Sequence, residues 1–327
     1  MTIVEMGPFD AARNFDGSDE LYRGVGTWLG VPAFLSVNYT HGYEGRLIAD
    51  ALRHHGHQRI GLVGAGGMAH GFVEAISSRF DNPSALVEAT DLVDALKAIK
   101  SPEEIELIKA AAALQDEVFS DVIAAMRPGL RDMDIAALAQ HAGRIRGSEQ
   151  GIVLGSSAPL GFRSRFLGSH MQGRTLKAGD HLALLIEING PGGFYTEIAR
   201  TIVLGRATNE LTDGFAAVKA AQDNVLTKIR PGASCAAIAA DHNDYMRTYG
   251  MPEEHRLFAH GQGYDLVERP LIRHDETMCL AEGMCLAVHP GFENERMFAV
   301  ICDNYLVTNE GVSTCLHKTE KRIFETA

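Results

Sequence analysis

Four side chains that can bind a metal ion or move a proton stand at matching places in two similar stretches of this sequence. Glu187 and Glu197 fall on the two strands of one predicted hairpin, and His289 and Cys302 fall at the equivalent places of a second. Carboxylates and imidazoles transfer protons or bind metal ions, and a thiolate is a good ligand for zinc or iron. Because equivalent strands of a duplicated unit can converge, we expect these side chains to share one pocket.

Two histidines lie in loops that also match. His170 is in the Gly-rich segment 168–173 before the first hairpin, and His260 opens the Gly-rich segment 260–265 before the second. Tyr264 and Glu268 follow His260 closely. Flanking glycines let the backbone approach a ligand, and an imidazole near neutral pH can bind a metal ion, donate a hydrogen bond or move a proton. Their equivalent positions favour a functional role for both histidines.

The hairpins belong to a repeated unit. A leucine and a short Gly-containing turn open the strands at 176–187 and 280–289, and segments 195–201 and 299–303 form the return strands. Upstream, Arg127-Pro128-Gly129 and Arg230-Pro231-Gly232 each end one helical pattern and precede another. The sequence therefore predicts two copies of a unit made of two helices and a hairpin, which is an α+β arrangement.

The same residues also admit structural roles. Glu187 and Glu197 could form ion pairs with Arg200 or Arg163. Cys302 is more typical of a small core residue than of a nucleophile, since nothing in the sequence fixes a base beside it.

The N-terminal part reads as a separate small α/β domain. Residues 31–37 and 59–64 look like strands, and a domain boundary is expected near residue 100, where Ser101-Pro102-Glu103-Glu104 combines an N-cap, a first-turn proline and a capping-box glutamate. The glycines of segment 64–69 match a dinucleotide fingerprint, but too little chain surrounds them for a doubly wound sheet. We interpret them as a tight turn between strand and helix.

Composition narrows the class of protein. The chain has 327 residues and a formal net charge of -12, which disfavours nucleic acid or an anionic membrane as the main partner. Its five cysteines are odd in number and lack paired CxxC spacing, so we expect a reducing cytoplasm rather than a disulfide framework. No apolar stretch approaches the ~18 residues that a membrane span needs.

Three segments together resemble the pita-bread fold shared by methionine aminopeptidase, Xaa-Pro aminopeptidase, prolidase and creatinase. They are residues 186–201, 260–270 and 282–291. The first hundred residues resemble a shortened N-terminal domain of the prolidase-like and creatinase-like members. The resemblance implies a pita-bread catalytic domain over 101–327, a short creatinase-like α/β domain over 1–100, and a homodimer.

The metal positions of that family are altered here. By resemblance, its metallopeptidases hold two metal ions with two Asp, one His and two Glu residues. The five positions are filled, in chain order, by Glu187 (or Ile186), Glu197, His260, His289 and Cys302. The second His of the family's HGxGxxxHE pattern is Val267, although Glu268 remains. These substitutions lead us to expect no dimetal site and no cofactor.

Creatinase shows by resemblance how this fold can hydrolyse a C–N bond without metal, using a histidine at the position of His170. We therefore predict a hydrolase that cleaves a C–N bond of a small amide or amidine compound, with His170 as general acid or base. The predicted catalytic residues are His170, Glu197, His260 and His289, and the predicted substrate-binding residues are Glu187, Tyr264, Glu268 and Cys302.

Two alternatives stay open. One is a metal-dependent Xaa-Pro dipeptidase or aminopeptidase with an altered site, in which one divalent ion binds among Glu187, Glu197, His260, His289 and Cys302. The other is a noncatalytic binding protein on the same fold. In the leading interpretation the partner is a small-molecule substrate, and neither nucleic acid nor a membrane is a partner.

Overall fold

The chain divides into two compact units. The computed structural model describes residues 1–7, 11–18, 22–54, 59–80, 82–167 and 173–326. One unit is Met1–Asp94 and the other Ala95–Ala327, and each is described by itself. The assignment of residues 1–100 to a shortened creatinase-like domain stays a prediction.

The first unit contains two small sheets. Its strands are β1 (Thr2–Met6), β2 (Ala12–Asn14), β3 (Thr27–Val31), β4 (Ile60–Leu62) and β5 (Leu86–Glu88). Its helices are α1 (His41–His54), α2 (His70–Ser77) and the start of α3 (Thr90–Ala98). Strand β3 lies between β1 and β2, and β4 pairs in parallel with β5. The strand predicted over 31–37 is wrong: β3 ends at Val31, because Pro32 has no amide hydrogen to continue the ladder.

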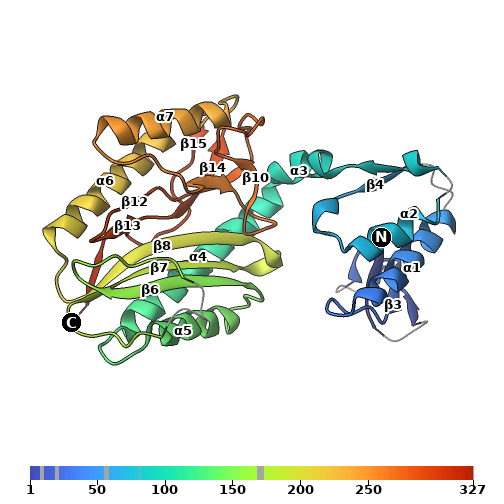
Figure 1. Cartoon of the computed structure of the whole chain (residues 1–327), viewed down its shortest axis with the longest axis horizontal. Helices are drawn as coiled ribbons and strands as arrows, with labels where there is room; N and C mark the ends of the chain where they lie inside the picture. Colours follow the sequence, from blue (N-terminus) through green and yellow to red (C-terminus); the bar gives the residue numbers. More distant parts are fainter. Residues whose placement is uncertain (8–10, 19–21, 55–58, 81, 168–172, 327) are drawn as a thin grey trace. The chain divides into compact units, whose positions relative to one another are not determined.

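The second unit begins with two helices on a four-stranded sheet (Figure 1). The helices are α4 (Pro102–Ala125) and α5 (Asp132–Arg144). The strands are β6 (Gly151–Pro159), β7 (Asp180–Asn189), β8 (Tyr195–Leu204) and β16 (Phe324–Thr326), in the order β16-β8-β7-β6. The predicted capping box is confirmed at the start of α4: the Ser101 hydroxyl accepts from the amide of Glu104, whose side chain accepts from the amide of Ser101.

The rest of this unit repeats the pattern. Its helices are α6 (Asn209–Leu226) and α7 (Cys235–Thr248). Its strands are β9 (Ala259–Gly261), β10 (Glu268–Leu271), β11 (Cys285–Val288), β12 (Gly291–Glu293), β13 (Phe298–Val300), β14 (Asp303–Thr308) and β15 (Gly311–Val312). Five of these strands form a sheet in the order β10-β9-β11-β14-β15, and β12 pairs with β13. The return strand predicted at 299–303 is divided between β13 and β14.

Matching hydrogen bonds confirm the internal duplication. The amide of Gly129, after α4, donates to the carbonyl of Leu176 at 2.9 Å, and the amide of Gly232, after α6, donates to that of Leu280 at 2.8 Å. Both glycines have positive φ, of 93° and 82°, which a residue with a side chain rarely adopts. Each half therefore closes its helix pair onto the start of its own hairpin in the same way.

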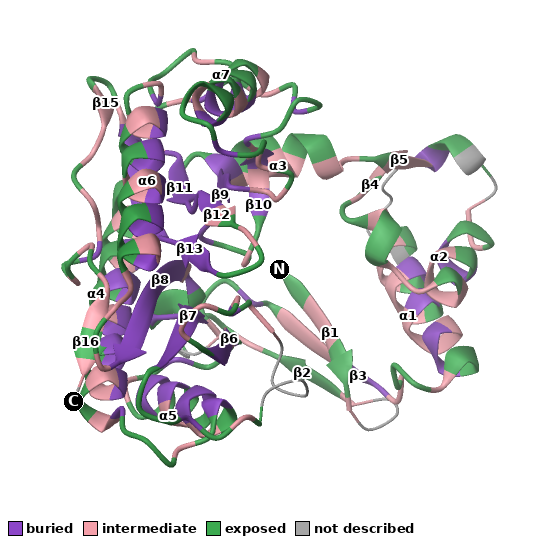
Figure 2. Ribbon diagram, turned by 60° about the vertical axis from the view of Figure 1, so that its left-hand side comes forward, coloured by how far each residue is buried: buried purple, intermediate pink, exposed green. Residues whose placement is uncertain are grey.

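The central hairpin of the first half is buried on both faces. Figure 2 shows β7 and β8 as almost wholly buried ribbons. Ile186 and Ile198 pack with Phe119 of α4 in one hydrophobic cluster, whereas Leu185 and Ala199 pack in another cluster. Because side chains alternate along a strand, the residues flanking Ile186 and Ile198 point away from the helices. Glu187, rather than Ile186, is thus the residue that faces the second half.

Among the described residues, no helix is long and apolar enough to cross a membrane.

Candidate active site

Strand pairing brings the predicted site residues together from both halves of the second unit. Glu187 of β7 lies directly opposite Glu197 of β8. His260 lies on β9, which pairs with β11, and His289 follows the last residue of β11. Cys302 lies between β13 and β14, where its backbone forms a bridge to Ala199 of β8. The duplicated hairpins therefore do converge.

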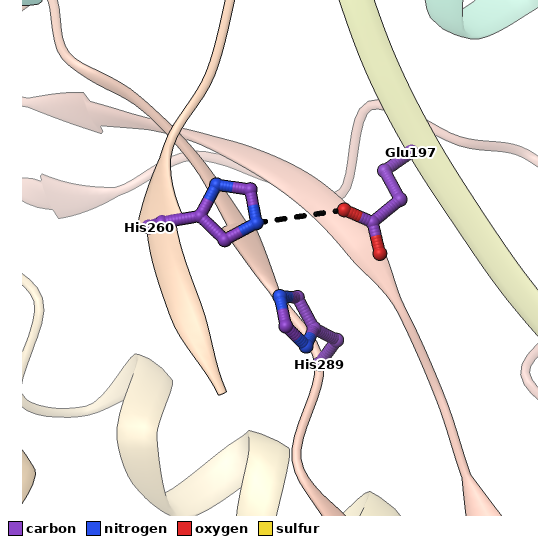
Figure 3. A group of neighbouring side chains, drawn as sticks. All are labelled: Glu197, His260 and His289. Atoms are coloured by element: carbon purple, nitrogen blue, oxygen red, sulfur yellow. Dashed lines mark ion pairs between the residues drawn. The ribbon is translucent and has the colours of Figure 1, made fainter. Parts of the chain in front are cut away.

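Three of these side chains form a buried cluster. One donor atom from each of Glu197, His260 and His289 lies within 4.8 Å of the others. Nε2 of His260 is 3.6 Å from Oε2 of Glu197, and the two imidazole rings meet edge to face with centroids 5.1 Å apart. Figure 3 shows the three side chains pointing toward one common space. We call these three residues the Glu-His-His cluster.

The hydrogen bond of His260 fixes its tautomer. Its Nδ1 lies 2.9 Å from the carbonyl oxygen of Gly261, which can only accept. Nδ1 therefore carries a proton, and Nε2 is the ring atom that faces the Glu197 carboxylate. An anionic oxygen beside Nε2 favours either a proton on Nε2 or a cation between the two atoms.

His289 is oriented by Arg256. Nη2 of Arg256 lies 3.5 Å from Nδ1 of His289, and a guanidinium can only donate. The proton of the neutral ring is then on Nε2, which is buried and has no hydrogen-bond partner in the described part of the chain. Burial lowers the pKa of His289 to about 4, so the ring is neutral near pH 7. Nε2 is thus an unused polar atom that faces the cluster.

The two glutamates have opposite proton affinities. Burial, followed by the nearby charge of Glu197, raises the pKa of Glu187 to about 9. Burial acts to raise the pKa of Glu197 as well, but His289 and His260 outweigh it and lower that pKa to about 2. The amide of Gln262 donates to Oε1 of Glu187 at 2.8 Å, so the acid proton of Glu187 is on Oε2. One carboxyl is therefore a proton donor and its neighbour a carboxylate.

Cys302, which the family resemblance predicts at a metal position, is held as a thiol. Burial, followed by the charge of Glu197, raises the pKa of Cys302 well above its ordinary value. Its Sγ donates to the backbone carbonyl of Glu197 at 3.5 Å, and the side chain packs with Leu185, Ala199 and Ala287. It lies beside the cluster without contributing a donor atom to it.

Tyr264 and Glu268 lie apart from the Glu-His-His cluster. Glu268 forms a buried ion pair with Lys100, and its other oxygen accepts from the amide of Tyr264 at 3.0 Å. The Tyr264 hydroxyl donates to Glu104, and its ring is partly exposed. His170, the predicted general acid or base, lies outside the described residues. The substrate-binding roles of Tyr264 and Glu268 remain predictions.

The arginines considered as structural partners of the glutamates have other partners. Arg200 pairs with Asp303 inside the protein, and Arg163 lies 3.3 Å from Glu293. Sequence reasoning missed Gln262 and Arg256, which contact Glu187 and His289. Gln262 sits inside the Gly-rich motif that follows His260, a position where a polar side chain could have been noticed.

Comparison with known proteins identifies the family. The chain belongs to the metallopeptidase family M24, whose model matches residues 106–309. An Xaa-Pro dipeptidase of Pyrococcus furiosus is 26% identical over 271 residues, which cover 81% of this chain and 75% of the relative. A probable dipeptidase PepE of Mycobacterium tuberculosis (strain H37Rv) is 29% identical over 241 residues, covering 71% of this chain and 63% of the relative.

Solved structures agree on the fold. An X-Pro aminopeptidase from Thermotoga maritima superposes with a TM-score of 0.76 at 21% identity, covering 86% of this chain and 78% of that one. A prolidase from Pyrococcus horikoshii gives 0.72 at 22% identity, covering 80% and 75%. The predicted pita-bread fold is confirmed, and the chain is a hydrolase of peptidase type that acts on C–N bonds. Members of a metallopeptidase family normally use divalent metal ions, so the expectation of no cofactor is not supported.

The donor set fits one divalent ion. Two imidazoles and a carboxylate form a set that zinc and iron both accept, and the unpartnered Nε2 of His289 would gain a ligand contact. An ion on Nε2 would move the ring proton to Nδ1, so Arg256 would then have to turn away. The two other predicted metal positions do not extend the cluster: Glu187 accepts a hydrogen bond from Gln262, and the Cys302 thiol donates to the carbonyl of Glu197. The described residues therefore match one ion better than two.

Proposed function

We propose that this protein hydrolyses a C–N bond of a small amide-containing substrate, in the manner of an Xaa-Pro dipeptidase, with one divalent ion held by Glu197, His260 and His289. The observation that carries the proposal is the Glu-His-His cluster, whose buried donor atoms lie within 4.8 Å of one another. The names of the dipeptidase relatives support the choice of a short peptide as substrate. The proposed reaction uses one ion, whereas the sequence led us to predict a reaction without metal.

The side chains of this site supply binding and proton transfer. A bound ion would polarise the scissile carbonyl or activate a water molecule. His260 and Glu197 would hold it, because Nε2 and the carboxylate face the same space. Glu187, protonated on Oε2, gives its proton to the leaving nitrogen as the C–N bond breaks. Water supplies the oxygen that bonds to the carbonyl carbon, and one of its protons restores Glu187, so atoms and charge balance.

A metal-free form of the same reaction is favoured by one contact. While Arg256 donates to Nδ1 of His289, Nε2 carries a proton and can donate to the carbonyl oxygen of a substrate. In that form Glu197 and His260 would activate the water. His170 keeps its predicted role as acid or base in this alternative.

Metal content and turnover separate these possibilities. Protein stripped of metal and reloaded with zinc, manganese or cobalt is assayed for hydrolysis of Ala-Pro, and bound metal is counted by elemental analysis. The proposal expects one ion per chain and turnover only in a reloaded form. Two ions per chain would refute the single-ion site, and full activity after stripping would establish the metal-free form.

Matched variants locate the ion. His289→Ala should lose ion binding, whereas His242→Ala should not, because His242 is a buried histidine stacked on Phe258 outside the cluster. Glu187→Gln should keep the ion but lose ~10²-fold or more in kcat, the usual contribution of a general acid. Loss of the ion in Glu187→Gln would show that Glu187 is a ligand.

The homodimer and the cytoplasmic location belong to the same proposal. They are supported by the family resemblance and by the cysteine pattern. Light scattering coupled to gel filtration tests the first, with a monomer mass as the contrary result.

A further inference from the structure

A chain of buried hydrogen bonds connects the two glutamates of the site through Asn304. Asn304 lies on β14 and Gln262 follows β9, and both side chains are fully buried. Nδ2 of Asn304 donates to Oε1 of Gln262 at 2.8 Å, and Nε2 of Gln262 donates to Oε1 of Glu187 at 2.8 Å. Oδ1 of Asn304 accepts from the backbone amide of Glu197 at 2.7 Å. We call Asn304 and Gln262 the amide pair.

Fixed groups at both ends set the direction of this chain. The backbone amide of Glu197 can only donate, so the side-chain oxygen of Asn304 faces it and the NH2 group faces Gln262. At the other end, the carbonyl of Leu266 can only accept, and it receives a hydrogen bond from Nε2 of Gln262 at 2.9 Å. Both ends therefore require the same orientation of the two side-chain amides.

His317 supports the orientation of Asn304. It is buried and lies in the segment between β15 and β16. Its Nε2 is 3.3 Å from Oδ1 of Asn304, which can only accept, so Nε2 donates a second hydrogen bond to this oxygen. A half-turn of the Asn304 amide would place its NH2 group against two donors and leave buried groups unpaired, which is costly. Asn304 is thus held in one orientation.

The direction of the chain decides how Glu187 is held. Because Gln262 offers a donor, Oε1 of Glu187 accepts, and the proton that the proposed reaction needs is on Oε2. If Gln262 were turned over, its oxygen would instead accept the proton of Glu187 and withhold it from the substrate. A buried network in which each member is bonded also restricts the positions that the carboxyl can take.

We propose that Asn304 and Gln262 are positioning residues, which hold the Glu187 carboxyl by Oε1 and leave Oε2 for proton transfer beside the Glu-His-His cluster. This inference rests on the proposed function, in which Glu187 gives its proton to the leaving nitrogen. Both amides act through Glu187 rather than on the substrate.

Reversing the chain tests the proposal most directly. Asn304→Asp keeps the oxygen that accepts from Glu197 but replaces the NH2 group by a second oxygen, which favours a turned-over Gln262 amide. In metal-loaded protein acting on Ala-Pro, we expect kcat to fall about tenfold to 10²-fold, with KM changed less than about twofold. Asn189→Asp is the matched control, because Asn189 is also buried and accepts from backbone amides at 2.8 and 2.9 Å outside this chain. It should keep the parent kcat.

A double variant separates positioning from a general loss of structure. If the amide pair acts through Glu187, Gln262→Met combined with Glu187→Gln should lose no more kcat than Glu187→Gln alone. Losses that multiply, or a parent-like kcat in the folded Asn304→Asp and Gln262→Met variants, would overturn the proposal. Gln262→Met also decides the matter if Asn304→Asp does not fold.

A spectroscopic measurement is independent of turnover. The side-chain NH2 signals of Gln262 are identified in amide NMR spectra of the full-length protein by their absence from Gln262→Met. We expect these signals to exchange slowly with solvent and to shift in Asn304→Asp and Glu187→Gln, but not in Asn189→Asp. Fast exchange, or unchanged signals in Asn304→Asp, would refute the chain.

The inference and the proposed function fail separately. Gln262 signals that behave as expected, in a protein that hydrolyses no amide, would uphold the orientation of Glu187 and refute the hydrolase. Hydrolysis of Ala-Pro together with unchanged Gln262 signals in Asn304→Asp would uphold the hydrolase and refute the positioning role.

Discussion

The buried ion pair between Lys100 and Glu268 gives the sharpest prediction about stability. The two side chains are 1% and 5% exposed, and they join the start of α4 to β10. Glu268→Gln leaves the Lys100 ammonium buried without a counter-charge. Breaking a buried pair in this way typically costs about 3–5 kcal/mol, a factor of roughly 10²–10⁴ in the folding equilibrium.

Denaturant unfolding followed by far-UV circular dichroism measures this loss. The single tryptophan of the sequence, Trp28, lies on β3 in the first unit, so its fluorescence reports that unit and should change little. Two controls bracket the effect. Glu106→Gln breaks an exposed pair with Lys109 and should cost less than about 1 kcal/mol. Lys100→Met with Glu268→Leu removes both charges and should recover most of the stability.

An unchanged stability of Glu268→Gln would also bear on the predicted substrate-binding role of Glu268. If Glu268→Gln is as stable as the parent, or if the double variant is no better than the single one, the ion pair does not stabilise the fold as argued. Unchanged stability together with weaker substrate binding would instead support the substrate-binding role predicted for Glu268.

The remaining predictions concern pH and helix capping. Burial acts to raise the pKa of Glu276, but Arg269 and the amides of Met278 and Leu271 outweigh it and lower the pKa from 4.5 to about 2. Because the folded pKa is the lower one, this stability, about 3 kcal/mol, is present above about pH 4.5 and lost as the pH falls toward 2. Glu276→Gln should therefore reduce the fall in the free energy of unfolding between pH 4.5 and pH 2, as measured by urea unfolding. An unchanged pH dependence would contradict the assignment. Ser101→Ala should lower the free energy of unfolding by about 1 kcal/mol in the same assay, because it removes the capping box. An unchanged free energy would show that α4 does not depend on its cap.

The duplicated scaffold could be predicted because its signals are local. Gly129 and Gly232 each follow an Arg-Pro pair, and each donates to the leucine that opens the next hairpin. The capping box at Ser101 and the alternation that aims Glu187 and Glu197 at one side of the sheet are equally short-range. Such features depend on residues a few positions apart, and a single sequence shows them directly.

The features that the sequence did not predict depend on contacts between residues that are distant in the sequence. Lys100 meets Glu268 across 168 positions, and nothing near either residue indicates a partner. Arg256 reads as one more charged residue in a polar loop until the fold places it against His289. Glu187 and Cys302 lie beside the cluster, but burial and the charge of Glu197 raise the pKa of both groups, so both hold their protons. Sequence alone thus located the site but did not give the protonation of its members.

The protonation of His289 links Arg256 to ion binding. An ion on Nε2 of His289 requires the ring proton on Nδ1, where Arg256 donates in this structure, so the ion and the Arg256–His289 contact exclude each other.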